Sequence, residues 1–127
     1  MREILFKAKT INGNWVNGLL ANKNDKWYIS NKAGSPFAYD VRPETICQFT
    51  GLTDKNGKKI WENDIVEAWS EGVCAKGKIK HRIDGHWIMY PAWQNGEMWY
   101  LLPNENGITT VEVIGNVFDN PELLEVN

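Results

Sequence analysis

The stretch Lys76-Gly-Lys-Ile-Lys-His-Arg-Ile-Asp-Gly-His-Trp-Ile-Met-Tyr90 decides the fold of this chain. Basic side chains occupy its even positions from Lys76 to Arg82, and the odd positions hold Gly77, Ile79, His81 and Ile83. A period of two is typical of a strand with one face in solvent and the other against a core. Asp84-Gly85 predicts a hairpin turn, and residues 87–93 its return strand. The stretch therefore predicts an antiparallel sheet.

Similar short segments lie on both sides of this stretch. Strands are predicted at residues 2–9, 27–29, 46–52, 58–61, 65–69, 98–102 and 108–117, separated by segments rich in Asn, Asp, Gly or Pro. Asn12-Gly13 predicts a two-residue hairpin, and residues 22–25 and 31–36 are predicted loops. Asn120-Pro121-Glu122 predicts one C-terminal helical turn, because Asn caps, Pro fits the first helical position and Glu complements the helix dipole.

The composition agrees with a β protein. The chain has 127 residues, of which 43% are hydrophobic and 24% charged, so the disordered, collagenous and coiled-coil classes are excluded. Seven Trp, four Tyr, four Phe and 11 Gly suit pleated surfaces joined by tight turns. We expect a single domain over residues 1–127 that is mainly β and forms a barrel or coiled sandwich.

Charge and cysteine content limit the partners and the compartment. Lys and Arg number 14 and Asp and Glu 16, so the net charge of −2 excludes a strong overall attraction to nucleic acid or acidic membranes. Cys47 and Cys74 are too few for a disulfide framework and too far apart for a CxxC pair. Residues 1–4 do not begin a signal peptide, and the apolar segment 87–93 is too short to span a bilayer. These features predict a soluble, unsecreted, cytoplasmic protein with no membrane contact.

The central block Ile46-Cys-Gln-Phe-Thr-Gly-Leu-Thr-Asp-Lys-Asn-Gly-Lys-Lys-Ile-Trp-Glu-Asn-Asp-Ile-Val66 resembles the signature of the YopX family of phage and prophage proteins. Residues 1–8 and 113–124 are similar to that family's start and ending. The resemblance implies a mainly β fold of coiled or bifurcated antiparallel sheets that form a partly open barrel, in a protein often encoded in mobile elements of Gram-positive bacteria. It implies no established activity and no catalytic residues. Cys47 and Asn63 stand where the family pattern usually has Gly, which predicts altered backbone geometry there.

The residue types in this block favour a structural role. Gly51 and Gly57 lie where the chain must turn, Asp54 can hydrogen-bond its own main chain, and the aliphatic residues supply core surface. The alternative is that Glu62 and Asp64 form a carboxylate pair for metal binding or acid–base chemistry. Two acids two residues apart supply few of the roughly six oxygens that a hard cation requires.

Other catalytic and metal-binding patterns are weak. His81, His86, Asp84 and Cys74 include zinc-ligand types, but His81 falls on the predicted core face and Asp84 in a turn, so convergence is not expected. The chain has no G-x-x-x-x-G-K-[ST], G-x-G-x-x-G or G-x-S-x-G motif. We therefore expect no enzymatic activity, no catalytic residues, no metal and no cofactor.

The basic strand has three interpretations. Small β-barrels bind single-stranded nucleic acid with a cationic face and aromatic platforms, and here a Lys/Arg strand precedes Trp87, Tyr90, Trp93, Trp99 and Tyr100. Alternating lysines also protect a solvated edge strand from association, while Trp at this density usually fills a core. Exposed Trp and Tyr are, thirdly, common at protein interfaces.

We therefore expect a non-enzymatic phage or prophage accessory protein that acts by binding. The leading hypothesis is a protein-interaction or self-assembling module, whose partner is a second copy or a phage or host protein. The alternative is a small β-barrel that binds single-stranded nucleic acid through Lys76, Lys78, Lys80, Arg82, Trp87 and Trp93.

Overall fold

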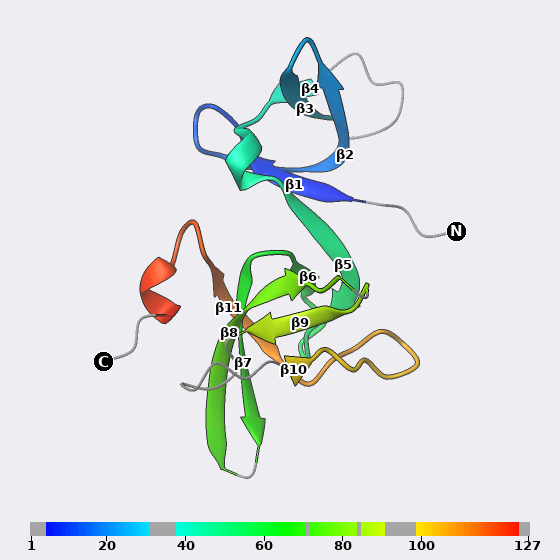
Figure 1. Ribbon diagram of the computed structural model, residues 1–127, viewed down its shortest axis with the longest axis vertical. Coiled ribbons are helices and arrows are strands. Elements are labelled where there is room, and N and C mark those ends of the chain that lie inside the picture. Colours follow the sequence, from blue (N-terminus) through cyan, green and yellow to red (C-terminus); the bar gives the residue numbers. More distant parts are fainter. Residues whose placement is uncertain (1–4, 31–37, 71, 84, 91–98, 125–127) are drawn as a thin grey trace. The chain divides into compact units, whose positions relative to one another are not determined.

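The computed structural model describes residues 5–30, 38–70, 72–83, 85–90 and 99–124 (Figure 1). The chain divides into two compact units, residues 1–49 and 50–127. Strands dominate both units, and the helical elements of the described residues are two short 3-10 turns. The expectation of a single domain over residues 1–127 stays a prediction.

The first unit is an antiparallel sheet with strand order β4-β3-β2-β1-β5. Its elements are β1 (Phe6–Lys9), β2 (Trp15–Lys23), β3 (Lys26–Ser30), β4 (Ala38–Asp40), the 3-10 turn η1 (Pro43–Thr45) and the start of β5 (Cys47–Thr53). Ala8, Ile29 and Val41 form its buried core, against which Phe6, Val16, Leu20, Trp27 and Ile46 pack. Strand β5 continues along the chain into the second unit, where β6 (Lys59–Trp61) is its neighbour.

A five-stranded antiparallel sheet forms the rest of the second unit. Its strand order is β10-β9-β8-β7-β11, built from β7 (Asp64–Ser70), β8 (Val73–His81), β9 (Trp87–Tyr90), β10 (Trp99–Tyr100) and β11 (Glu112–Asn116). A second 3-10 turn, η2 (Pro121–Leu124), follows β11. The core of this unit comprises Leu52, Ile60, Val66, Ala68, Ala75, Ile79, Met89, Leu101 and Val111, with Trp87, Trp99 and Val113 packed against it.

One five-residue turn recurs in both units. In each copy the first residue's amide donates to the carbonyl of the fifth, and the amide of a glycine at the fourth position donates back to the carbonyl of the first. All four glycines have a positive φ, between 78° and 91°. These hydrogen bonds and the left-handed glycine are typical of a three-residue hairpin loop with a left-handed residue at its end. The copies are Thr10–Asn14, Asp54–Lys58, Arg82–His86 and Asn104–Ile108.

Asp54 gives its copy of this turn an added long-range connection. Its side chain is 1% exposed, and Oδ1 accepts hydrogen bonds from the amides of Asn56 (2.8 Å) and Lys58 (2.9 Å). Oδ2 accepts a third from the amide of Val113 (3.0 Å), fifty-nine residues away. Burial, the largest single influence, raises the pKa of Asp54, but the three amide donors and the charge of Lys58 outweigh it and leave the pKa below its ordinary value. Asp54 therefore joins the turn to β11 as a charged acceptor.

The predicted fold class is confirmed: the chain is mainly β, with two antiparallel sheets and a short C-terminal 3-10 turn. Both sheets keep two edge strands in the part of the chain described, so neither closes into a barrel. The predicted two-residue hairpin at Asn12-Gly13 is wrong, because five residues separate Lys9 from its partner Trp15. The two-residue hairpin lies instead at Asn24-Asp25, where both residues have the positive φ that a type I′ turn requires.

The structure also contains elements that the sequence did not predict. Strand β4 and turn η1 were not predicted, and residues 31–36, predicted as a loop, lie outside the described residues. Among the described residues, no helix is long and apolar enough to cross a membrane.

Candidate nucleic-acid interface

The predicted row of basic residues lies in the middle of the five-stranded sheet. Lys76, Lys78 and Lys80 are on β8, which pairs with β7 on one side and β9 on the other. A strand with neighbours on both sides has no free edge to protect. The interpretation of these lysines as a solvated edge is therefore wrong. On their face of the sheet Lys76 and Lys80 are exposed, whereas Lys78 is half-buried beside Ile65, which is fully buried.

The predicted alternation holds along the strand and fails beyond its end. Gly77 and Ile79 are buried, and Lys76 and Lys80 are exposed, as the pattern requires. His81 is exposed, however, and Ile83 is fully so, with 102% relative exposure. The reason is that β8 ends at His81, and the chain then enters the turn that begins at Arg82.

Two tyrosines share the face of the lysines. Tyr90 pairs with Lys78, and Tyr100 pairs with Ile88, which in turn pairs with Lys80; residues directly opposite in an antiparallel sheet point to the same side. The rings of Tyr90 and Tyr100 are 38% and 40% exposed. We call the set Lys76, Lys78, Lys80, Arg82, Tyr90 and Tyr100 the cationic face.

Within the cationic face, each tyrosine lies beside a cation. Lys80 Nζ is 5.2 Å from the ring centroid of Tyr90, and Arg82 Cζ is 5.6 Å from that of Tyr100. These are cation–π distances. A nucleotide has a flat base and a charged phosphate, so an exposed ring with a neighbouring cation offers a contact for each part.

The described tryptophans among those predicted as stacking platforms, Trp87 and Trp99, are not on this face. Trp87 pairs with His81, their rings are stacked with centroids 4.3 Å apart, and Trp87 packs against the core on the opposite side of the sheet. Trp99 also packs against the core. Trp93 lies outside the described residues. Of the predicted aromatic group, the structure brings Tyr90 and Tyr100 to the lysines.

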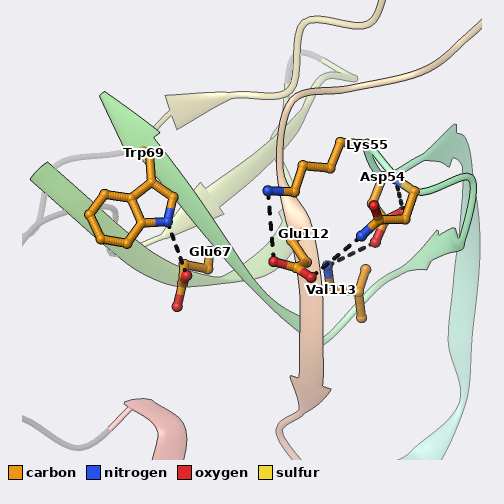
Figure 2. A network of polar contacts seen from close by, with 7 residues as sticks. Asp54, Lys55, Glu67, Trp69, Glu112 and Val113 are labelled. Atoms are coloured by element: carbon orange, nitrogen blue, oxygen red, sulfur yellow. Dashed lines mark hydrogen bonds and ion pairs between the residues drawn. The ribbon is translucent and has the colours of Figure 1, made fainter. Parts of the chain in front are cut away.

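Trp69, which the sequence analysis did not single out, is the most exposed described tryptophan, at 63%. Its indole Nε1 donates to Glu67 Oε1 at 3.2 Å, and Glu67 lies directly opposite Glu112 on β11 (Figure 2). Glu112 in turn has Lys55 Nζ 3.8 Å from its Oε2. Because core-facing Val66 and Ala68 alternate with Glu67, the sequence already contained the signal that Trp69 points outward. Glu67 and Glu112 thus form an acidic end of the face, where Lys55 balances one of the two negative charges.

The zinc-ligand types do not converge. Cys74 and His81 are seven residues apart on β8, roughly 23 Å in an extended strand, and an odd separation places them on opposite faces. Asp84 lies outside the described residues. Among those described, no group of three His, Cys, Asp or Glu side chains could hold a metal ion. Burial, followed by the charge and hydrogen bond of Glu67, raises the pKa of the Cys74 thiol, which disfavours the thiolate that a ligand or nucleophile requires.

The acidic residues of the central block have structural contacts. Asp64 is 2% exposed, and its Oδ2 accepts a hydrogen bond from the amide of Trp61 at 2.9 Å. Between them Asn63 has a positive φ of 69°, donates its amide to the carbonyl of Ile79 and accepts from the amide of Val117. Asp64 is therefore held by the turn, which favours the structural interpretation over a Glu62–Asp64 catalytic pair.

Together, the fold and the cationic face define a small all-β protein whose most distinctive described surface is a sheet face that carries cations and exposed tyrosines. The chain belongs to the YopX family: the family model described as YopX protein matches residues 6–125. The resemblance of the central block is thereby confirmed. No match is found among the curated proteins.

Proposed function

We propose that this protein is a non-enzymatic phage or prophage accessory protein that binds single-stranded nucleic acid on the cationic face. Family membership supports the association with phage. The observation that carries the binding proposal is the position of the lysine row on a central strand, with Tyr90 and Tyr100 exposed on the same face.

A single strand suits this face better than a duplex. Base stacking on an aromatic ring requires an unstacked base, which a duplex does not present. Alternate residues of a strand are roughly 6.6–6.8 Å apart, of the same order as the spacing of phosphates along an extended single strand. The cations on β8 therefore follow the repeat of the backbone they would neutralise.

The test is binding of a fluorescent twelve-nucleotide oligothymidylate, measured by anisotropy over a salt series. Each single-strand phosphate contact contributes a slope of about −0.7 in log affinity against log salt. Lys78→Ala with Lys80→Ala is expected to reduce the magnitude of the slope by about 1.4. Lys23→Ala with Lys26→Ala, which removes two exposed lysines at a hairpin end of the first unit, is the charge-matched control and leaves the slope unchanged.

Stacking has a separate test. Tyr90→Ala and Tyr100→Ala are each expected to weaken binding about fivefold to a hundredfold, because one stacked base contributes about 1–3 kcal/mol. Tyr39→Ala, at a 45% exposed tyrosine of the first unit, is the control and has no effect. Absence of salt-dependent binding by the unaltered protein rejects the proposal.

Trp69 supports a second candidate, the protein-interaction or self-assembling module. A tryptophan with 63% of its surface exposed is typical of interface hot spots, and the partner would be a second copy or a phage or host protein. Self-association predicts a mass that rises with concentration in sedimentation experiments and falls back to the monomer in Trp69→Ala. A constant monomer mass in the unaltered protein would reject self-assembly.

A further inference from the structure

The four basic residues of the cationic face have unequal surroundings. Lys76 lies directly opposite Glu67 on β7, and the Cβ atoms of such a pair are about 4.5–5.5 Å apart. On its other side Glu67 lies opposite Glu112. The carboxylate of Glu67 therefore lies beside Lys76, and that of Glu112 has Lys55 Nζ 3.8 Å from its Oε2.

Lys78 and Lys80 have uncharged neighbours across the sheet. Lys78 lies between Ile65 and Tyr90, and Lys80 lies opposite Ile88. Lys80 lies over the ring of Tyr90, and the guanidinium of Arg82 lies over the ring of Tyr100. The electrostatic character of the face thus changes between Lys76 and Lys78.

We infer that the nucleic-acid footprint ends at this boundary, an inference that rests on the proposed function. Lys78, Lys80 and Arg82 contact phosphates. Lys76 does not, because Glu67 lies directly opposite it and balances its charge, and Lys55 beside Glu112 leaves this end of the face without a net positive charge. The ligand is a short single-stranded segment that lies over β8 and the tyrosines of β9 and β10, and its backbone leaves the sheet before the acidic end.

Lys76 and Lys78, two lysines of one row, should differ in their contribution to the salt slope of binding. The unaltered protein is expected to have a salt slope of about −2, from three phosphate contacts at about 0.7 each. Lys78→Ala should lower the magnitude by about 0.7, whereas Lys76→Ala should leave it unchanged. All three proteins are compared on the same twelve-nucleotide oligothymidylate.

Removing the acidic charges should extend the footprint. Glu67→Gln with Glu112→Gln keeps the side-chain size and frees Lys76, so the slope should rise in magnitude by about 0.7. Affinity should then go on rising to a longer oligothymidylate length than in the unaltered protein. Glu44→Gln with Glu105→Gln, at an exposed acid of the first unit and an exposed acid of the loop after β10, changes net charge equally and should change neither quantity.

The outcomes separate the two proposals. If the unaltered protein binds with a salt slope but Lys76→Ala lowers that slope as much as Lys78→Ala, the boundary is refuted and the binding function stands. The boundary is also refuted if the Glu67 and Glu112 variant matches its control. If the unaltered protein binds no oligonucleotide, both proposals are overturned.

Discussion

Replacing Asp54 tests how this fold is held together, because the chain contains a matched turn for comparison. Asp54 and Asn104 occupy the same first position of the recurring turn, and the Oδ1 atom of each accepts two amide hydrogen bonds within its own turn. Asp54 differs in being charged and 1% exposed, and in accepting a third bond from Val113. Asn104 is exposed.

The expected cost follows from these bonds. A hydrogen bond to a charged group contributes about 1.5–3 kcal/mol to stability. The full contribution of three such bonds is an upper limit, because water can replace Asp54 as the acceptor for the two turn amides. We expect Asp54→Ala to lower the free energy of unfolding by about 3–5 kcal/mol. Asn104→Ala removes two neutral bonds at a solvated site and should cost about 1 kcal/mol.

Urea unfolding followed by tryptophan fluorescence measures both values. The m-value should be the same in the unaltered protein and both variants, since the surface exposed on unfolding does not change. Equal losses in the two variants would refute the reasoning, because they would mean that the link from Asp54 to Val113 contributes nothing beyond the local turn.

Three further predictions concern the same framework. The pKa of Asp54 in the folded state lies below its ordinary value of 3.8, so the charged side chain stabilises the fold fully above pH 3.8. The difference in the free energy of unfolding between the unaltered protein and Asp54→Asn should therefore shrink as the pH falls below 3.8. A difference in urea unfolding that does not change with pH would contradict this. Gly115→Ala should lower the free energy of unfolding by about 1–3 kcal/mol, because the added Cβ would lie 2.6 Å from Asn120 Oδ1 and 2.9 Å from Leu123 Cδ1. Adding Leu123→Ala to this variant should recover part of the lost stability, measured by thermal unfolding. Asn63 has a φ of 69°, so Asn63→Ala should lower the free energy of unfolding by about 1–2 kcal/mol, whereas Asn63→Gly should not lower it. Equal melting temperatures of the two variants would contradict a backbone requirement at this position.

The fold could be predicted from local signals to a large extent. Alternation located β8, and Asn-Gly or Asp-Gly pairs located the turns at residues 13, 57 and 85, where glycine takes a positive φ. The type of each turn could not be predicted as well as its position. At Asn12-Gly13 only the glycine is left-handed, whereas Asn24-Asp25, without a glycine, forms the two-residue hairpin. Which turn forms depends on the register and twist of the paired strands, and these are set by contacts beyond the turn.

The candidate site shows the same division between local and long-range information. The sequence contained the lysine row, and Asp84-Gly85 predicted the hairpin that pairs β8 with β9. The pairing of β8 with β7 on its other side, which makes β8 a central strand, was not predicted. The faces of Trp87 and Tyr90 could have been separated, because three residues along one strand reverse the side-chain direction. Trp87 faces the core and Tyr90 faces the lysines, although both lie on β9.

The central block and the candidate face carry different information about this protein. Within residues 46–66, Asp54, Gly57, Asn63 and Asp64 each satisfy a demand of the main chain, by accepting amide hydrogen bonds or by adopting a positive φ. Every residue of the cationic face lies beyond that block, between positions 76 and 100. A chain that shares the block with this one therefore shares the turns that build the fold, without necessarily sharing a ligand. Experiments on function should for that reason alter the residues of β8, β9 and β10, where a change of charge or ring leaves the framework of turns in place.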